Sequence, residues 1–272
     1  MVHRRDSKED VIDAQVILDD GARVTYTLSG KGRPVVLLHC WAGNRRFWSE
    51  QLKVLSQSHK VLALDFPGHG ESDVPEENLT VEKLAEDVHE VMQKLQLSPA
   101  VVAGHSMGGM VAQQLYISHS EDVSGLILVA TIGSGLNVNL VSVRILKEAP
   151  QKGYRNSFLS HFNSWFMSQS DPRHLKWIRE QMLSIPEKVA MSLAASFQKF
   201  DLRRYLPYVH VPTLVICAGG DASTTPADCS ALAEWIPGAA LVMVPATGHF
   251  VQIENPEAVN QAVGKFLKGH NL

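Results

Sequence analysis

The sequence predicts an α/β protein in which a mostly parallel sheet carries helices on both faces and a helical segment is inserted into that core. Short apolar runs alternate with helix-patterned segments, as expected when strands are buried on both faces of a parallel sheet. The alternation stops after residue 133 and returns at residue 212. Residues 136–209 show only helix-like runs rich in aromatic side chains. We therefore expect a core formed by residues 1–133 and 211–272 and a helical cap formed by residues 134–210.

The first elements follow from local patterns. Two strand-like runs flank Asp19-Asp20-Gly21, a turn signal that predicts a hairpin. Buried strands are expected at residues 34–39 and 60–65, with a helix at 46–55 between them and a loop at 66–72. Thr80 suits the N-cap of an amphipathic helix over residues 81–95, whose apolar residues recur on one face.

The later elements repeat this rhythm. Strands are expected at residues 100–103 and 123–130, before the predicted cap. After it come strands at 212–217 and 240–244 and helices at 226–235 and 256–267. We expect residues 1–12 to form a tail outside this fold.

Length and composition restrict the classes of function. The chain has 272 residues, 45% of them hydrophobic, which suits one large globular domain with an insertion. A formal net charge of −3 argues against a general nucleic-acid-binding protein. The cysteines Cys40, Cys217 and Cys229 form no Cys-x-x-Cys pair, so we expect neither a disulfide scaffold nor a zinc site. No Walker-type phosphate loop is present, and we expect no cofactor.

The opening of the chain bears on its location. Residues 1–10 are charged and lack an apolar run, so we expect no signal peptide. No apolar stretch is long enough to span a bilayer. The sequence therefore predicts a cytoplasmic protein.

The predicted strand at 100–103 runs into Gly104-His105-Ser106-Met107-Gly108, and a helical pattern follows directly. A Gly-x-Ser-x-Gly pentapeptide alone is weak evidence, because about one chain in ten of this length would contain one by chance. The order of strand, tight turn and helix is more specific, since it predicts a strained turn that presents the serine at the end of the sheet. The glycines let neighbouring backbone approach such a turn closely.

A base and an acid follow two other predicted strands. His249 comes after the strand at 240–244, and Asp221 comes after the strand at 212–217. Ligands of open α/β sheets bind beyond the carboxyl ends of the strands, where these groups are expected to meet. A serine nucleophile needs a base, and the base needs an orienting carboxylate. Asp65 also ends a strand, but its Phe-Pro-Gly-His-Gly surroundings favour a role in a turn.

With these motifs, the chain resembles the α/β-hydrolases over nearly its whole length. The family's order of nucleophile, acid and base reads Ser106, Asp221, His249 in this sequence. The resemblance implies an eight-stranded type of sheet and an oxyanion hole formed by the backbone N–H groups of Met107 and Trp41. Relatives usually show His-Gly-x where this chain has His39-Cys40-Trp41, so Cys40 takes the usual glycine position.

The resemblance also implies the chemistry. It favours a serine hydrolase (EC 3.1) that cleaves small to medium esters, lactones or related carbonyl compounds through an acyl-enzyme on Ser106. The substrate is expected to be apolar or aromatic, anionic compounds included, and the sequence leaves the oligomeric state open. Side chains near the elbow and from the cap are expected to form the pocket: Cys40, Trp48, His105, Phe162, Trp165, Phe166 and Phe250.

Two other classes of function stay open on this fold. One is a cofactor-independent dioxygenase that cleaves an N-heteroaromatic ring with the His249–Asp221 pair as its base. The other is a low-turnover ligand receptor. Relatives with an aspartate nucleophile, such as haloalkane dehalogenases and epoxide hydrolases, are disfavoured because Ser106 stands at the elbow.

The predicted cap is unusually basic. Residues 134–210 contain 11 Lys and Arg against 5 Asp and Glu. Such a segment could attract anionic substrates by electrostatic steering. An ordinary solvated helix surface is the favoured alternative.

Overall fold

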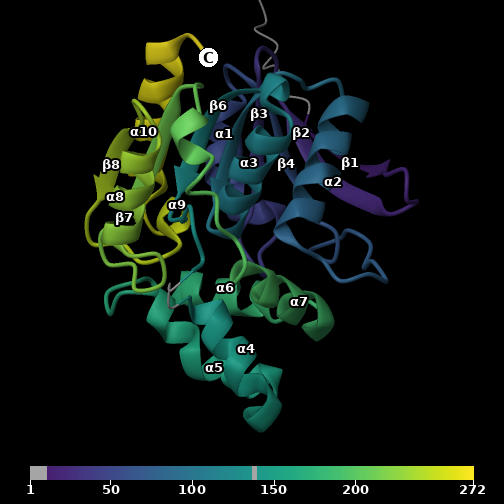
Figure 1. Cartoon of the computed structure of the whole chain (residues 1–272), viewed down its shortest axis with the longest axis vertical. Coiled ribbons are helices and arrows are strands. Elements are labelled where there is room, and N and C mark those ends of the chain that lie inside the picture. Colours follow the sequence, from purple (N-terminus) through teal and green to yellow (C-terminus); the bar gives the residue numbers. More distant parts are fainter. Residues whose placement is uncertain (1–10, 137–139) are drawn as a thin grey trace, which may run out of the picture.

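The computed structural model describes residues 11–136 and 140–272. Residues 1–10 of the predicted tail and residues 137–139 of the predicted cap lie outside this part. Eight strands form one sheet in the order β1-β2-β4-β3-β5-β6-β7-β8 (Figure 1). The strands are β1 Ile12–Ile17, β2 Arg23–Ser29, β3 Pro34–Leu38, β4 Lys60–Leu64, β5 Ala100–His105, β6 Val123–Val129, β7 Thr213–Ala218 and β8 Ala240–Val244.

The predicted fold class is confirmed. β1 and β2 form the expected antiparallel hairpin, in register from Ile12 opposite Leu28 to Ile17 opposite Arg23. β2 is also antiparallel to β4. Every pairing from β4 through β8 is parallel, so the carboxyl ends of these strands share one edge.

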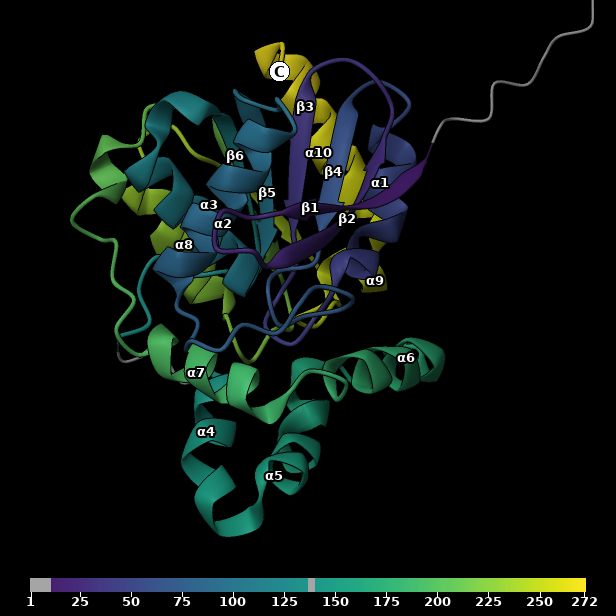
Figure 2. The same ribbon diagram turned by 90° about the vertical axis from the view of Figure 1, so that its right-hand side faces the viewer.

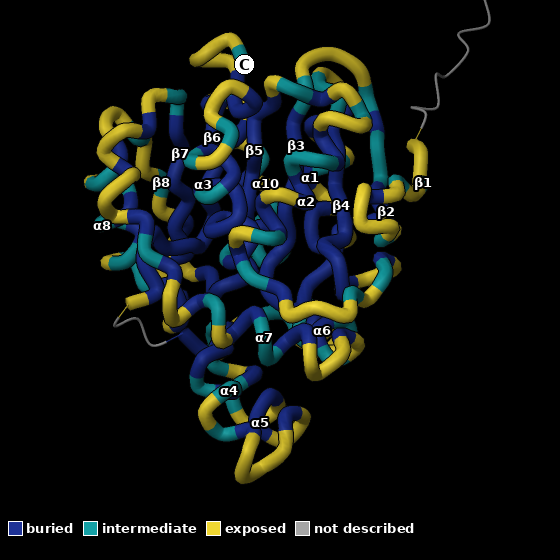
Figure 3. Tube along the Cα trace, turned by 45° about the vertical axis from the view of Figure 1, so that its right-hand side comes forward, coloured by how far each residue is buried: buried dark blue, intermediate teal, exposed yellow. Residues whose placement is uncertain are grey.

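Helices cover both faces of the sheet (Figure 2). On one face lie α2 (Val81–Lys94), α3 (Met107–Ser118) and α8 (Pro226–Trp235); on the other lie α1 (Ser49–Leu55), α9 (Val251–Glu254) and α10 (Pro256–His270). Alternate strand residues enter the two cores: Val36 and Leu38 pack with α2 and α3, while Val35 and Leu37 pack with α1 and α10. Figure 3 shows the central strands buried and the outer turns of the helices exposed.

Two helix starts show the local chemistry. Thr80 caps α2 as predicted, because its hydroxyl accepts the amide of Lys83. The helix expected at 46–55 is divided into a short 3-10 turn, Arg45–Trp48, and α1. The Asn44 side chain accepts the amide of Arg46 and so starts this turn.

Residues 140–209 form helices and turns rather than further strands of the sheet. Helices α4 (Val141–Lys152), α5 (Tyr154–His161), α6 (Pro172–Met182) and α7 (Glu187–Phe197) lie together beyond one edge of the sheet (Figures 1 and 2). The chain before α4 meets the chain after α7, since Ser134 and Asp201 form an isolated antiparallel bridge. We propose that these helices form a cap inserted into the core. The chain exits the core and returns to it at the same place, so the insertion does not change the order of the strands in the sheet.

Across residues 11–136 and 140–272, we find no helix with both the length and the apolar character that a bilayer span requires.

Candidate active site

Ser106 occupies a strained turn between β5 and α3. Its φ of 54° and ψ of −116° lie in a region that residues with a side chain rarely adopt. The turn is fixed from both sides: the Ser106 amide donates to Val129 O (2.9 Å), and Thr131 Oγ1 donates to Ser106 O (2.7 Å). This is the strand–turn–helix geometry that presents a nucleophilic serine.

The two glycines of the pentapeptide are required by close backbone contacts. A Cβ on Gly104 would lie 2.1 Å from the carbonyl oxygen of Gly108. A Cβ on Gly108 would lie 2.2 Å from the carbonyl oxygen of Leu38, the last residue of β3. Any side chain at either position would push the start of α3 away from the strand ends. The glycines therefore bring the first turn of α3 against the loop that follows β3.

The three residues predicted as nucleophile, base and acid meet at the carboxyl edge of the sheet. His249 Nε2 lies 3.0 Å from Ser106 Oγ, and His249 Nδ1 lies 2.6 Å from Asp221 Oδ2. Because a carboxylate only accepts, Nδ1 carries the proton and Nε2 is left free to accept from the serine hydroxyl. Ser106 is half-buried, whereas Asp221 and His249 are buried.

Asp221 is held by its own loop. Its Oδ1 accepts the amides of Ser223 (2.7 Å) and Thr224 (3.1 Å), and its Oδ2 accepts the hydroxyl of Thr224 (2.6 Å). These donors compensate the buried charge and fix the carboxylate plane toward His249. Thr224 is a positioning residue that the sequence analysis missed; its place three residues after the predicted acid was the available signal.

His249 is held through its backbone. Its amide donates to Trp165 O (2.7 Å), and its carbonyl accepts from His105 Nε2 (2.8 Å). Gln252 Nε2 in turn donates to His105 Nδ1 (2.9 Å), so His105 is the neutral Nε2–H tautomer. Burial lowers the pKa of His105 well below its usual value, which keeps it neutral. His105 therefore orients the loop of the base and transfers no proton.

The predicted oxyanion donors are free to bind a ligand. Met107 is the first residue of α3, where backbone amides have no intrahelical acceptor. In the part of the chain that the structure describes, neither the Met107 nor the Trp41 amide donates to a protein acceptor. Both residues line the same cavity as Ser106. Two unpaired amides beside a serine hydroxyl form the arrangement that stabilises an oxyanion.

Cys40, in the usual glycine position, is accommodated without chemistry of its own. Burial raises the pKa of its thiol, so the thiolate needed for nucleophilic attack is disfavoured. The preceding His39 donates from Nδ1 to Cys40 O (2.8 Å) and accepts the Phe66 amide at Nε2 (3.0 Å). Burial lowers the pKa of His39 to about 3. His39 thus shapes the turn as a neutral side chain.

A narrow cavity opens at Ser106 and is lined by some of the predicted pocket residues. Cys40, Trp165 and Phe250 line it, together with the proposed triad base and both oxyanion donors. Further side chains complete the wall: Met110, Thr131, Ile132, Leu140, Ser142, Met182, Phe197, Ser223 and Thr224. Phe197 is one of the aromatic residues of the predicted cap, from which pocket side chains are expected. Thr131 and Ile132 directly follow a strand and could have been found by that rule. Leu140, at the N-cap of α4, and Met182, in α6, come from the segment beyond the sheet, whose packing no local pattern reveals.

The other four predicted pocket residues do not line this cavity. Trp48 packs in the core on the α1 and α10 face of the sheet. His105 lies behind His249, bonded to its carbonyl. Phe162 and Phe166 contact each other at 5.1 Å between ring centroids, and they touch the cavity wall from outside through Trp165 and Phe250.

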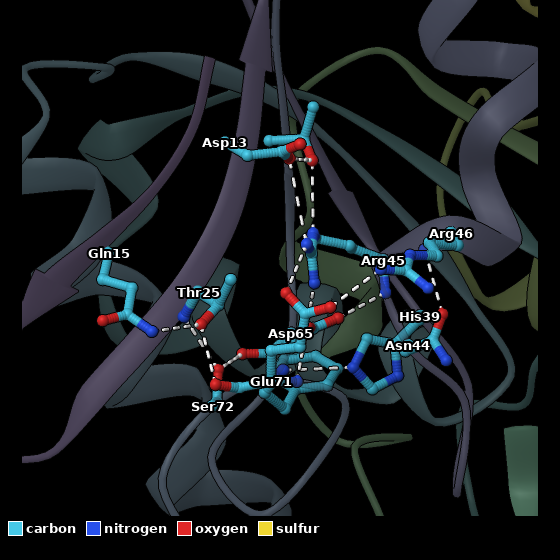
Figure 4. Close-up of polar contacts among 12 residues, drawn as sticks. Asp13, Gln15, Thr25, His39, Asn44, Arg45, Arg46, Asp65, Glu71 and Ser72 are labelled. Atoms are coloured by element: carbon cyan, nitrogen blue, oxygen red, sulfur yellow. Dashed lines mark hydrogen bonds and ion pairs between the residues drawn. The ribbon is translucent and has the colours of Figure 1, made fainter. Parts of the chain in front are cut away.

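Asp65 has the turn role that its surroundings predict (Figure 4). It forms a buried ion pair with Arg45 (Nη1 to Oδ2, 2.5 Å) and accepts the amides of Arg45 (2.6 Å) and Glu71 (3.0 Å). Glu71 also pairs with Arg45 at 2.8 Å. The loops that follow β3 and β4 are thereby tied together, and this support lies directly behind the turn carrying Cys40 and Trp41.

Two overlapping groups of residues that could ligate a metal lie elsewhere among the described residues, on α2 and after α3; the second consists of His119, Glu121 and Asp122. Glu86, His89 and His119 bring their donor atoms within 4.8 Å of one another. The two imidazole rings are stacked at 3.6 Å with an interplanar angle of 6°, so their in-plane lone pairs run parallel and do not converge on one ion. Each ring already pairs with a carboxylate at 2.9 Å. The two histidines of the first group are thus engaged in hydrogen bonds with carboxylates, His89 with Asp122 and His119 with Glu86.

Comparisons with known proteins identify the family of this fold. The family described as alpha/beta hydrolase fold matches residues 33–256. A dihydrolipoyllysine-residue acetyltransferase component of an acetoin cleaving system from Pseudomonas putida is 31% identical over 90% of this chain, which spans only 66% of that protein's length. An enol-lactonase from Burkholderia xenovorans LB400 superposes with a TM-score of 0.86 at 27% identity, covering 94% of this chain and 100% of that one. A thermophilic esterase from Thermogutta terrifontis superposes with a TM-score of 0.85 at 27% identity, covering 97% of this chain and 100% of the esterase.

Proposed function

The chain belongs to the alpha/beta hydrolase family and is an enzyme of that family, and from this premise we propose that it is a serine hydrolase acting on carboxylic esters or lactones. The observation that carries the proposal is the hydrogen-bonded series Ser106 Oγ, His249 Nε2, His249 Nδ1 and Asp221, with distances of 3.0 and 2.6 Å. The enol-lactonase and the esterase among its structural neighbours support the same reaction class.

The proposed reaction begins with acylation of the enzyme. His249 Nε2 takes the hydroxyl proton as Ser106 Oγ attacks the substrate carbonyl carbon. Asp221 stabilises the resulting imidazolium, and the amides of Met107 and Trp41 bind the oxyanion. When the tetrahedral intermediate collapses, the bond to the leaving oxygen breaks and His249 gives that oxygen the proton.

Deacylation repeats the sequence with water. His249 takes a proton from a water molecule that attacks the acyl carbon, and the oxyanion forms again at the same two amides. The bond to Ser106 Oγ then breaks, the serine recovers a proton from His249, and the carboxylic acid leaves. Each atom and proton used in acylation is restored, so the cycle needs no cofactor.

A fluorophosphonate probe tests the nucleophile. We expect stoichiometric labelling of Ser106 by mass spectrometry, and loss of labelling in Ser106→Ala and His249→Ala. Ser142→Ala is the matched control, because Ser142 lines the same cavity without a base and its loss should leave labelling unchanged. Absence of label on Ser106 in a folded protein would contradict the proposal.

The same variants separate the two alternative classes. Ser106→Ala should abolish ester hydrolysis, whereas an oxygenase that uses His249 and Asp221 as its base, or a ligand receptor, would largely keep its activity. Oxygen uptake with N-heteroaromatic substrates and ligand binding without turnover are the corresponding measurements. We also propose a cytoplasmic location, in keeping with three free, buried cysteines, which cell fractionation would test.

A further inference from the structure

The cavity at Ser106 is lined by groups without formal charge, apart from the proposed catalytic base. Among its sixteen lining residues, only His249 and Cys40 have ionisable side chains, and burial keeps Cys40 as a neutral thiol. No Lys or Arg of the described residues lines the wall. Residues 137–139, which precede the lining residue Leu140, read Asn-Val-Asn in the sequence and include no ionisable side chain.

The polar side chains of the wall are mostly engaged within the protein. Thr131 donates to the Ser106 carbonyl, and Thr224 donates to Asp221. Ser223 Oγ accepts the amide of Val141 (3.4 Å). The hydroxyls of Ser142 and Ser223 can still donate, and two neutral hydroxyls replace only part of the hydration shell of an anion. The rest of the wall consists of thioethers, aromatic rings and aliphatic groups.

The basic residues of the predicted cap do not supply the missing charge. All cations of residues 140–210 are exposed except the half-buried Arg144, and none of them lines the cavity. Several are already paired at the surface, as in Arg173 with Asp171 and Arg203 with Asp201. These cations therefore do not contact a substrate inside the cavity, and a role in steering a substrate toward it from solution stays an expectation.

We infer that the acyl group accepted by this site is uncharged and apolar, and that a carboxylate on it is rejected. This inference rests on the proposed function and narrows its substrates to neutral aliphatic or aromatic acyl compounds. Transfer of an ionised carboxylate from water into a cavity whose wall carries no cation costs free energy, because no charge-assisted hydrogen bond replaces the lost hydration. Hydrocarbon acyl chains gain instead from contact with side chains such as Met110, Met182 and Phe197.

A pair of shape-matched esters tests the inference. Ethyl 4-methylpentanoate and monoethyl succinate differ by an isopropyl group in place of a carboxylate, so size is held nearly constant. We expect kcat/KM, measured by ethanol release, to be at least about 100-fold lower for the succinate monoester. Equal rates for the two esters would overturn the inference.

A pair of variants tests whether the missing cation in the cavity wall causes the preference for uncharged esters. Met182→Lys places a cation among the lining residues, and Met182→Gln is its neutral control of similar length. We expect the lysine variant, but not the glutamine variant, to raise the relative rate on monoethyl succinate by about tenfold or more. Thermal melting of both variants checks that the cap helices stay folded. The matched esters on the unmodified protein decide the question whether or not the variants fold.

The outcomes separate this inference from the proposed function. If Ser106 is not labelled by fluorophosphonate and neither ester is hydrolysed, the proposed function fails. If Ser106 is labelled and both esters react equally, only the inference on charge fails. If Ser106 is labelled but neither ester turns over, competition of the two esters against labelling measures the same preference, and equal protection would overturn the inference.

Discussion

Replacing Gly248 by alanine should break the contact between the loop of the proposed base, His249, and Trp165 of the predicted cap. Gly248 directly precedes His249, whose amide donates to Trp165 O at 2.7 Å. A Cβ on Gly248 would lie 2.4 Å from Trp165 O and 2.9 Å from Phe166 Cα. Both are backbone atoms, which a rotamer change cannot move. The hydrogen bond that holds the loop of the base must therefore lengthen or break.

The geometry gives the size of the effect. Ordinary contacts of a Cβ begin near 3.4 Å, so the loop and the Trp165 carbonyl must separate by about 1 Å. A displacement of that size at a catalytic group costs roughly 100-fold in rate. We expect Gly248→Ala to lower kcat for a small neutral ester by about this factor.

Two further glycines calibrate the experiment. Gly264→Ala in α10 is the control, because its Cβ would meet no atom within 4 Å, and it should keep full activity. Gly220→Ala should have a smaller effect than Gly248→Ala, because the nearest atom is Met167 Sδ, at the end of a flexible side chain. If Gly248→Ala keeps the kcat of the unmodified protein, the hydrogen bond to Trp165 O does not position His249, and this reasoning is refuted.

Three other substitutions test separate parts of the structure. Asp221→Asn should lower kcat about 10⁴-fold. The amides of Ser223 and Thr224 would hold the Asn oxygen at the Oδ1 position, so its NH2 group would face His249 and disfavour the Nδ1–H tautomer. A loss of less than tenfold in steady-state kinetics would exclude Asp221 as the orienting acid. Arg45→Met should destabilise the protein by about 3–5 kcal/mol in urea unfolding, since Asp65 would be left buried and unpaired; a change below about 1 kcal/mol would show that the two backbone amides suffice. His69→Asn should make the free energy of unfolding less sensitive to acid. Burial, and secondarily the neighbouring His39, lowers the pKa of His69 to about 3 in the folded protein. The unfolded chain therefore binds an extra proton, and stability is lost as the pH falls below about 6.5. Between pH 7 and pH 5 this one residue accounts for about 2 kcal/mol of the loss, and an unchanged difference between these pH values in the variant would contradict the assignment.

The sequence by itself determined the layered core and the positions of the reacting groups. A strand buried on both faces must be apolar at every position, so the parallel strands are readable as continuous runs. Ser106 and Asp221 each follow such a run within a few residues, and His249 follows β8, an apolar strand at the edge of the sheet that is largely exposed. Because parallel strands end at one edge, groups distant in the chain could be expected to meet there without knowledge of the packing. The same reasoning predicted the turn role of Asp65 but not its partner Arg45, which approaches from the loop of a neighbouring strand.

Only the tertiary structure decided which side chains surround the substrate. Phe47 and Trp48 are neighbours in one 3-10 turn, yet Phe47 contacts Trp177 and Phe250 near the cavity while Trp48 packs in the core on the α1 and α10 face of the sheet. Among the aromatic residues of the predicted cap, Trp165 and Phe197 reach the cavity, whereas Phe162 and Phe166 do not. Their sequence pattern is the same in either case, because a buried aromatic ring gains about as much from the interior of a helical cap as from the wall of a pocket. The rotation and docking of the cap helices, which depend on contacts between segments far apart in the chain, make that choice.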